Sequence, residues 1–452
     1  MKRDYLASLR NGENLSLKQQ LFLIFQLSLP AVLAQLSVII MSYIDASMVG
    51  RLGASDSASI GLVASTTWLI SGFCFAAAMG FTVQASHLLG AKREEEARNL
   101  LKNALLVNLI YTFLLTAVFL SLSSSIPLWL GASEEIYDNA RIYFMIFALS
   151  IPVIQFNNLA ELMLQSSGEM KIPSILQIFM ALLNVCLNYL FIFILHKGVF
   201  GAALATLISR FTVTVFLMFF LFFHSPSLRL KKGEKFVFKK EYIKKAFRIG
   251  LPVAFEQLIM GGGQVAYTKI VAPLGKIALA ANSFGITAES LCYMPAYGLG
   301  AAATTLTGQA YGAKRYDLTL RLGYLTNGIG IIMMILTGGL LFIFAPQMIG
   351  FLSPDLQIKK MGAKILRIEA FSEPFYGSSL VVNGALRGTG DTLIPSIYKF
   401  ISMWLIRIPL AIFLRSRFGL EGVWFAMSFE LCVRGILFLI RLHSKKWIPI
   451  SQ

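Results

Sequence analysis

The chain has 452 residues, of which 56% are hydrophobic and only 14% are charged. This composition excludes an ordinary soluble globular protein, in which about a quarter of the residues carry a charge. The net charge of +17 suggests nucleic acid only superficially, because the basic residues lie in short segments between apolar stretches and form no basic groove. We therefore expect a polytopic protein of the lipid bilayer that binds no nucleic acid.

Apolar segments follow one another along the whole chain, and each is long enough to cross a membrane as a helix of roughly 20–25 residues. They predict about twelve spans, approximately at residues 20–47, 57–88, 103–123, 139–164, 172–195, 199–223, 247–272, 278–309, 322–346, 363–386, 393–414 and 420–441. The expected fold is all-α. An even number of spans places both ends of the chain on the same side of the membrane.

The charges of the loops predict which side that is. Lys92, Arg93 and the dense basic run from Arg229 to Lys245 lie on the side of the termini, whereas the opposite loops carry few basic residues, such as Lys197 and Lys276. Basic loops are retained in the cytoplasm. Both termini are therefore predicted to be cytoplasmic, in a multi-pass protein of the cell membrane.

A polar connection near the middle of the chain divides the sequence into two similar halves. We predict an N-terminal six-helix lobe at 1–224, a cytoplasmic basic linker at 225–245 and a C-terminal six-helix lobe at 246–452. Short motifs recur with a constant separation of 222 positions: Leu29-Pro30 and Leu251-Pro252, Leu52-Gly53 and Leu274-Gly275, Gly90-Ala91-Lys92-Arg93 and Gly312-Ala313-Lys314-Arg315, Pro152 and Pro374, and Ile172-Pro173-Ser174-Ile175 and Ile394-Pro395-Ser396-Ile397.

Each half contains an even number of predicted spans, so both halves enter the membrane in the same direction. This arrangement predicts parallel repeats related by a pseudo-two-fold axis along the membrane normal. Two such lobes enclose a central cleft. Rocking of one lobe against the other would open that cleft alternately to the two sides of the membrane.

Several motifs, considered together, resemble a known family. They are Gly90-Ala91-Lys92-Arg93, Tyr311-Gly312-Ala313-Lys314-Arg315, Asn184-Val185-Cys186-Leu187-Asn188-Tyr189 and Gly384-Ala385-Leu386-Arg387-Gly388-Thr389-Gly390-Asp391-Thr392. From about Leu21 to Leu442 the chain resembles bacterial members of the multidrug and toxic compound extrusion (MATE) family. The resemblance implies a twelve-helix antiporter that exports cationic or amphipathic organic compounds in exchange for Na⁺ or H⁺, without a cofactor and as a monomer.

The first predicted span contains an acid, Asp45, although no charged residue occurs between Gln20 and Tyr43. An ionisable group at membrane depth costs at least about 2.5 kcal/mol on insertion scales unless it faces a partner or a wet cavity. We therefore expect Asp45 to be functional. It can become tolerable in the membrane by binding a cation or by taking up a proton.

Three neutral polar residues, Asn184, Asn188 and Thr206, come out near the depth of Asp45 when residues are counted along their spans at about 1.5 Å each. The i, i+4 spacing of the two asparagines puts both amides on one helix face. A carboxylate with neutral oxygens is a ligand set that small hard cations prefer. The sequence thus predicts a Na⁺ or proton site here, and no other metal site.

These positions also resemble the cation site in the amino-terminal lobe of the family, which implies a contribution from the carbonyl of Ala202. In some family members an aspartate occupies the position of Asn188, so this chain has a less negative site. The alternative is that both asparagines and Thr206 only hold helices together by hydrogen bonds.

The second half contains its own candidates for substrate binding or proton coupling, namely Glu256, Glu289, Glu373 and Tyr376. Counting residues along the spans places the three acids at a similar depth, where they could form an anionic wall of a pocket for a cationic drug. Tyr376 stands where some family members have an aspartate, one turn after Glu373. The alternative is that Lys399 or Arg407 neutralises these acids. Glu430 and Arg434, spaced i, i+4, are expected to form an intrahelical pair.

The sequence is less consistent with two other functions, a lipid flippase and an enzyme. A flippase for a lipid-linked saccharide or a related lipid shares the two-lobed architecture, but it would line its cleft with more arginine and lysine than this chain offers. An enzyme would need a nucleophile with a base, or a metal cluster. The histidines lie separately at span ends, at His87, His196, His224 and His443. The protein is therefore not expected to be an enzyme.

Overall fold

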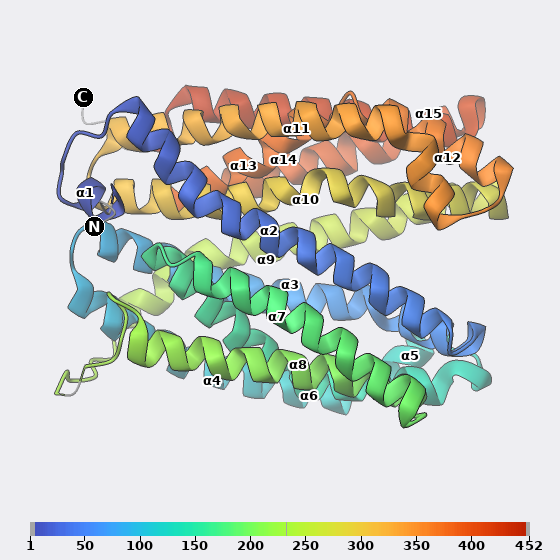
Figure 1. The fold of residues 1–452 in the computed structure, drawn as a ribbon, viewed down its shortest axis with the longest axis horizontal. Helices are drawn as coiled ribbons and strands as arrows, with labels where there is room; N and C mark the ends of the chain where they lie inside the picture. Colours follow the sequence, from blue (N-terminus) through green and yellow to red (C-terminus); the bar gives the residue numbers. More distant parts are fainter. Residues whose placement is uncertain (1–4, 232, 449–452) are drawn as a thin grey trace. The chain divides into compact units, whose positions relative to one another are not determined.

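A computed structural model of the chain describes residues 5–231 and 233–448. Within those residues all regular secondary structure is helical, with no β-strand (Figure 1). The outermost ends, residues 1–4 and 449–452, for which a cytoplasmic location is predicted, lie outside the described residues.

Long helices make up both halves of the chain. The first half contains α1 (Tyr5–Arg10), α2 (Leu17–Gly50), α3 (Ala54–Gly90), α4 (Glu94–Ser121), α5 (Ser125–Trp129), α6 (Glu134–Ser167), α7 (Lys171–Asn188) with a π-helical end at Tyr189–Ile194, and α8 (Gly198–Phe219) with a π-helical end at Phe220–His224. The second half contains α9 (Lys240–Val271), a short 3₁₀ turn at Ala272–Leu274, α10 (Lys276–Gly312), α11 (Tyr316–Leu352), α12 (Leu356–Glu369), α13 (Glu373–Thr389), α14 (Leu393–Phe400), a π-helical segment at Ile401–Arg407 and α15 (Ile408–Ser444).

These helices lie at the predicted spans. The tenth span is formed by α12 and α13, and the last two spans form one helical run that is broken at Gly419, where φ is 58° and ψ is −135°. By length and apolarity alone, eight helical runs in the described part of the chain are able to cross a membrane. Among the helices that are not counted in that way, α9, α10 and α13 carry more polar and small residues, and these helices supply many of the buried side chains described below.

The internal duplication is visible in the backbone as well as in the sequence. Residues with positive φ recur at the same separation of 222 positions: Gly53 and Gly275, Lys92 and Lys314, and Gly168 and Gly390. The last pair ends α6 and α13 in the left-handed conformation that glycine adopts without steric cost. Both repeats therefore turn at equivalent positions.

The contacts between residues divide the chain into two compact units. The N-terminal unit is Ser37–Ala254, and the C-terminal unit is Met1–Leu36 with Phe255–Gln452. The chain passes from one unit to the other inside α2 and inside α9, a few residues after the repeated prolines Pro30 and Pro252. The predicted lobes follow the sequence repeat. In the structure, the first part of α2 belongs to the C-terminal unit, and the first part of α9 belongs to the N-terminal unit.

Close helix contacts show the exchange directly. In the N-terminal unit α9 begins against α3, where a Cβ added to Gly250 would lie 2.8 Å from the carbonyl oxygen of Ala76. In the C-terminal unit α2 begins against α10, where a Cβ added to Gly298 would lie 2.6 Å from the backbone nitrogen of Val32. Ala76 and Gly298 are equivalent positions of the two repeats. Each opening helix thus starts on the second helix of the other repeat.

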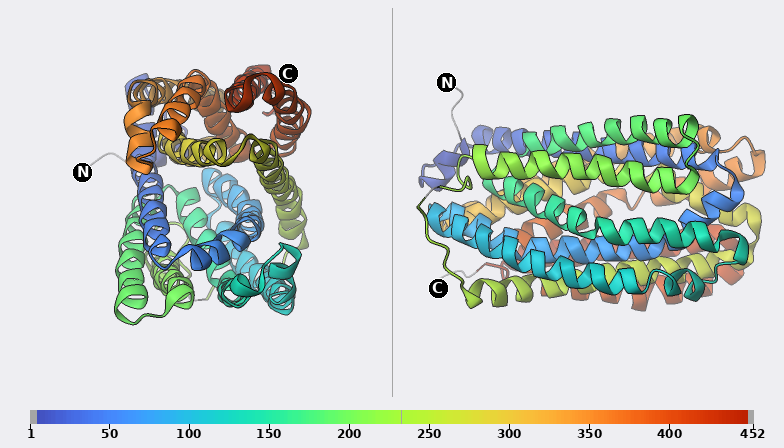
Figure 2. Two further views of the ribbon diagram at one scale, coloured as in Figure 1. Left: turned by 90° about the vertical axis from the view of Figure 1, so that its right-hand side faces the viewer. Right: turned by 90° about the horizontal axis from the view of Figure 1, so that it is seen from below.

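Within each unit the long helices run side by side (Figure 2). In the N-terminal unit α6 packs against α3, α4 and α8. In the C-terminal unit α10 and α13 approach so closely that a Cβ on Gly384 would collide with the carbonyl of Gly300. Thr304 and Thr307 donate across this contact to the carbonyls of Gly384 (2.8 Å) and Ala385 (2.9 Å). Small residues and hydroxyl groups of this kind are typical of helix contacts in membranes.

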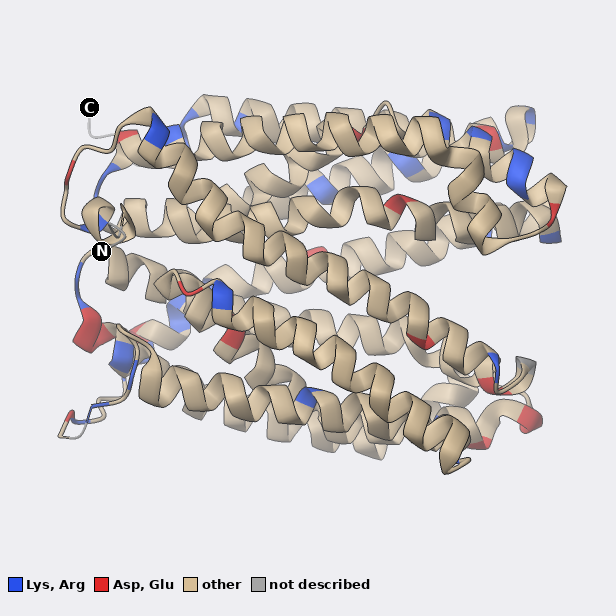
Figure 3. Cartoon of the chain, in the orientation of Figure 1, with Lys and Arg blue, Asp and Glu red and all other residues tan. Residues whose placement is uncertain are grey.

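Charged residues are concentrated at the helix ends and in the loops, and few lie along the middle of the helices (Figure 3). Large apolar side chains are exposed along the helices, as at Phe113 (73%) and Trp68 (76%). This distribution is expected for helices surrounded by lipid. The few charged groups inside the helices therefore need a specific explanation.

Candidate cation site

The acid in α2 meets the end of α7. The carboxylate of Asp45 accepts a hydrogen bond of 2.6 Å at Oδ1 from the Nδ2 of Asn188. Asn188 is 2% exposed, and the π-helical turn begins at the next residue. Widened turns of this type are frequent at functional sites. The Asn188 amide at the end of α7 thus reaches the Asp45 carboxylate of α2.

The amide of Asn184, one turn earlier on α7, reaches the same carboxylate. With its nitrogen turned toward Asp45, this amide donates to Oδ1 (2.7 Å) and Oδ2 (3.1 Å) and accepts from the hydroxyl of Thr206 (3.2 Å). With its oxygen turned toward Asp45, two acceptors would face each other, which is unfavourable unless a cation or a proton lies between them. The orientation of the Asn184 amide is therefore linked to the charge at Asp45.

Thr206 extends the same network into α8. Its hydroxyl lies 3.1 Å from the carbonyl oxygen of Ala202, to which it donates when it does not donate to Asn184. The structure thus brings together all the residues that the sequence predicted for a cation site. No lysine or arginine of residues 5–231 and 233–448 forms an ion pair with Asp45.

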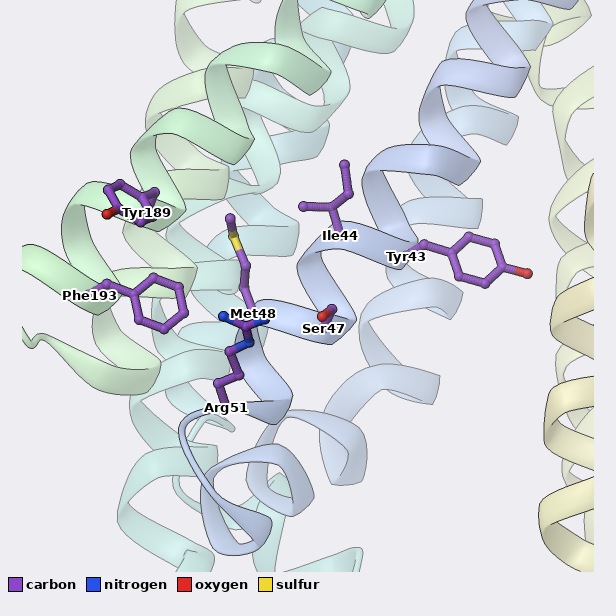
Figure 4. A pocket seen from close by; sticks show the side chains of 7 residues that line it. All are labelled: Tyr43, Ile44, Ser47, Met48, Arg51, Tyr189 and Phe193. Atoms are coloured by element: carbon purple, nitrogen blue, oxygen red, sulfur yellow. The ribbon is translucent and has the colours of Figure 1, made fainter. Parts of the chain in front are cut away.

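A cavity of about 530 Å³ lies between the ends of the two helices that carry Asp45 and Asn188 (Figure 4). Its lining comes from the end of α2 and from the π-helical end of α7, and consists of Tyr43, Ile44, Ser47, Met48, Arg51, Tyr189 and Phe193. Ile44 and Tyr189 directly adjoin Asp45 and Asn188 in the sequence. Tyr43 points away from Tyr189 and Phe193. Neither Asp45 nor Asn188 is itself among the lining residues.

A second polar group in the N-terminal unit was not identified from the sequence. Glu161 on α6 accepts hydrogen bonds from the side-chain nitrogens of Gln177 (2.6 Å) and Gln165 (3.1 Å). Arg210, one turn after Thr206 on α8, is close enough to interact electrostatically with Glu161. The signal in the sequence was the same as for Asp45, an ionisable residue inside an apolar span.

Glu256 of the C-terminal unit is held in ion pairs. Its Oε1 accepts from Nζ of Lys399 (2.5 Å) and from the guanidinium of Arg387 (2.6 Å). Glu256 and Lys399 are only 3% and 6% exposed. The pairing with Lys399 matches one of the alternatives raised from the sequence, and Arg387 is an additional partner that depth counting missed.

The second proposed neutralising residue, Arg407, pairs elsewhere. Its guanidinium lies 2.7 Å from Glu430, which also binds Arg434 at 2.7 Å. The predicted intrahelical pair of Glu430 and Arg434 is confirmed, and Arg407 completes it from a neighbouring segment. All three side chains are at most 5% exposed. This triad accounts for two of the intramembrane cations.

Glu289 and Glu373 lie apart from the Glu256 ion pairs and group instead with a third acid, Glu369. All three are buried, and their carboxyl groups are close enough to influence one another electrostatically. Glu369 accepts a hydrogen bond of 2.6 Å from Ser372, whereas Glu373 has the thiol of Cys292 beside it and no stronger donor in the described chain. Glu369, the last residue of α12, was not identified from the sequence, although it is an ionisable residue inside the predicted span 363–386.

Tyrosines adjoin this acid cluster. The ring of Tyr376 packs edge to face on Tyr293, with the centroids 5.2 Å apart, and Tyr293 contacts Tyr297 at 6.1 Å. Glu289, Tyr293 and Tyr297 follow one another at i, i+4 spacing along one face of α10. This face combines carboxyl groups with aromatic rings, and the faces of such rings attract organic cations.

Comparison with known proteins supports the duplication. The profile of the MatE family matches the chain twice, at residues 30–190 and 252–413. The two matches begin at Pro30 and Pro252, which are equivalent positions of the two repeats.

Related sequences cover nearly the whole chain. The probable multidrug resistance protein NorM of Thermotoga maritima is 29% identical, with 94% of this chain and 92% of that protein covered. The uncharacterized transporter YisQ of Bacillus subtilis is 26% identical, with 94% and 95% covered.

Solved structures share the fold. A crystal structure of MATE in complex with MaL6 superposes with a TM-score of 0.91 at 22% identity, covering 98% of this chain and 100% of that chain. The outward-facing conformation of a multidrug resistance MATE family transporter of the MOP superfamily gives 0.90 at 22% identity, with 99% of both chains covered. The predicted all-α, twelve-helix, two-lobed fold class is thereby confirmed. The chain belongs to the MatE family, the multidrug and toxic compound extrusion proteins, which are membrane transporters and not enzymes.

Proposed function

We propose that the protein is a secondary active multidrug efflux antiporter that exports cationic or amphipathic organic compounds in exchange for Na⁺ or H⁺. Membership of the MatE family and the multidrug resistance names of its NorM relatives support this function. The observation that carries the coupling step is the Asp45 carboxylate, which neutral amides surround and no basic side chain of the described chain neutralises. The transporter acts as a monomer in the cell membrane, with both termini in the cytoplasm.

Ion entry changes the interactions of Asp45. A proton or Na⁺ that reaches the carboxylate removes its net charge and favours the amide orientation in which the oxygen of Asn184 faces the site. Carboxylate, amide, hydroxyl and backbone oxygens then form a hard ligand set. Because α2, α7 and α8 all contribute, loading of the site alters the contacts among three helices. A ligand shifts a conformational equilibrium only by such differential contacts.

The acid and tyrosine face of the C-terminal unit is the proposed binding surface for the exported compound. Glu289 and Glu373 supply carboxyl groups, and Tyr293, Tyr297 and Tyr376 supply aromatic rings. A flat organic cation gains both from charge attraction and from contact with ring faces. Glu256, which two cations neutralise, holds α9 to the helices of Arg387 and Lys399.

The flippase alternative receives less support. A large anionic lipid-linked substrate would need unpaired cations in the interior. Instead Arg387 and Lys399 bind Glu256, and Arg407 and Arg434 bind Glu430.

Dye efflux from everted vesicles under separately imposed Na⁺ and pH gradients tests the proposal. We expect one of the gradients to drive efflux in the wild type and Asp45→Asn to abolish gradient-driven efflux while dye binding persists. Asp138→Asn, the same change at an exposed acid at the start of α6, is the matched control and should transport normally. Full efflux by Asp45→Asn, or efflux that requires neither gradient, would contradict the proposal.

A further inference from the structure

α9 begins at Lys240, so the connection before it is shorter than the predicted linker of 225–245. The described residues of this connection, 225–231 and 233–239, are here called the linker, and side chains of α4 hold it. The guanidinium of Arg98 binds the carboxylate of Glu234 through Nε (2.8 Å) and the terminal nitrogen (2.7 Å). Lys102, one turn further along α4, donates to the carbonyl of Glu234 at 3.0 Å. These contacts anchor the centre of the linker.

Two asparagines of α4 then hold the following residues by their backbone. The amide of Asn99 both donates to the carbonyl of Val237 and accepts from its N–H, each at 2.9 Å. Asn103 donates to the same carbonyl at 2.9 Å and accepts from the N–H of Lys239 at 3.1 Å. The amides thus satisfy the backbone groups as a neighbouring strand would. Because the backbone is bound, the adjacent side chains are directed outward.

The outward side chains are basic and apolar. Phe236, Val237 and Phe238 are exposed by 49%, 49% and 48%, so about half of each side chain is open to the surroundings. The lysines that flank them along the linker and the first turns of α9, namely Lys235, Lys240 and Lys244, are exposed as well. The basic residues near this end of the helices are visible in Figure 3. Three consecutive exposed apolar residues between lysines are unusual for a surface that faces only water.

The place of the linker in the chain indicates what covers it. It connects the ends of two membrane helices, so it lies at the level of the lipid headgroups. Aromatic side chains are favoured at this interface, and lysines extend their amines from it into water. The cytoplasmic leaflet carries anionic lipids that attract basic segments next to membrane helices. Both the charge and the aromatic groups of the linker therefore complement an anionic lipid surface.

We propose that the linker is a docking surface for anionic phospholipids of the cytoplasmic leaflet. The amines of Lys235, Lys240 and Lys244 bind the phosphate groups, and Phe236 and Phe238 enter the interfacial region of the bilayer. Arg98, Asn99 and Asn103 hold the backbone in the conformation that presents these groups. Lipid binding at this surface is independent of ion coupling at Asp45.

The test measures how much phosphatidylglycerol stays bound to the full-length transporter when it is extracted from vesicles of phosphatidylethanolamine and phosphatidylglycerol. Quantitative lipid mass spectrometry gives the amount per protein. The variant Lys235→Gln/Lys240→Gln/Lys244→Gln should bind phosphatidylglycerol on the order of 100-fold more weakly, and wild-type binding should fall with added salt. The matched control Lys197→Gln/Lys276→Gln/Lys360→Gln removes the same charge from exposed sites elsewhere and should bind normally. Equal losses in both triple variants, or no loss in the first, would overturn the proposal.

A second variant separates lipid from a soluble polyanion. Phe236→Ser/Phe238→Ser keeps every charge of the linker and should also lower the retained phosphatidylglycerol, whereas the exposed pair Phe113→Ser/Phe351→Ser should not. Unchanged lipid retention in the first double variant, together with binding of a short oligonucleotide that the lysines control, would assign the surface to a soluble anion and refute lipid docking. The dye efflux assay tests ion coupling at Asp45 and not lipid binding at the linker. Either proposal can therefore fail without the other.

Discussion

Asn188 donates its hydrogen bond to Asp45 from a position 143 residues further along the chain, and it joins the end of α7 to α2 at 2.6 Å. The carboxylate is thus stabilised by neutral dipoles and by no counter-ion of the described chain. Neutral amide donors leave the net charge of an ionised carboxylate in place, so this group attracts a cation or a proton. We regard this relationship as the physical origin of ion coupling in the proposed antiporter.

Replacing Asn188 with aspartate should strengthen Na⁺ binding. The change puts a second carboxylate next to Asp45, and the charge of the ligands sets the affinity of an oxygen site for a cation. We expect the apparent Na⁺ affinity to rise on the order of tenfold. The shift of the thermal unfolding temperature with NaCl measures it. Asn157→Asp, at a buried asparagine of α6, is the control, and an unaltered Na⁺ dependence of Asn188→Asp would count against a cation at this site.

Loss of the acid in α9 should destabilise the C-terminal unit. Glu256→Gln leaves Lys399 and Arg387 without their common carboxylate partner, and breaking a buried ion pair from one side costs about 3–5 kcal/mol. The double variant Glu256→Gln/Lys399→Met should recover part of that loss. Thermal unfolding followed by size-exclusion chromatography in detergent measures both. Normal stability together with lost efflux in Glu256→Gln would instead assign this acid to transport.

The contact of α10 with α13 should tolerate no larger residue at Gly384. An alanine there would drive its Cβ into the carbonyl of Gly300, and overpacking of this type costs about 1–3 kcal/mol. Gly339→Ala is the matched control, because a Cβ at Gly339 meets no atom within 4 Å. The unfolding temperature should therefore fall for Gly384→Ala only. Equal stability of both variants would show that the helices can separate slightly.

Attachment of the linker should depend on pH. The hydrogen bond from Arg98 holds the pKa of the Glu234 carboxyl below its usual range. A carboxyl whose pKa is lowered by folding contributes stability above its unfolded pKa, and this contribution is lost as the pH falls through the lowered value. Protection of the Val237 and Lys239 amides against hydrogen exchange, corrected for intrinsic rates, should therefore be full at neutral pH and decrease in acid.

The glutamine variant of the same residue distinguishes this cause from general unfolding. Glu234→Gln should remove most of the pH dependence of the linker amides, whereas Glu241→Gln, at an exposed acid in the first turn of α9, should leave it intact. An identical acid transition in all three proteins would show that Glu234 does not control it.

The architecture and the N-terminal polar network could be predicted because each depends on distance along a helix. A span needs about 20 apolar residues, and counting at 1.5 Å per residue placed Asn184, Asn188 and Thr206 near the depth of Asp45. The structure does bring these residues together. Their role in binding Na⁺ or H⁺ stays a prediction for the efflux experiments.

The polar groups of the second half show what depth along a helix cannot predict. Depth does not tell which way a side chain points around its helix. Lys399 does pair with Glu256, but Arg407 pairs with Glu430, and the second partner of Glu256 is Arg387. Glu369 lies inside the predicted span 363–386, but its grouping with Glu373 and Glu289 depends on how α10, α12 and α13 pack, which depth along one helix does not give. The exchange of the first parts of α2 and α9 between the units could not be predicted either, because a sequence repeat does not indicate which helices contact each other.

The exchanged beginnings of α2 and α9 make the two repeats dependent on each other for folding. A polypeptide with only one repeat would leave the surface around its own second helix bare, and its first helix would have nothing to lie on. A second identical copy would supply both missing contacts, as in a domain-swapped homodimer. The present chain has the organisation expected if two such subunits became joined in one polypeptide. The beginnings of α2 and α9 would then still pack as they did in the swapped dimer.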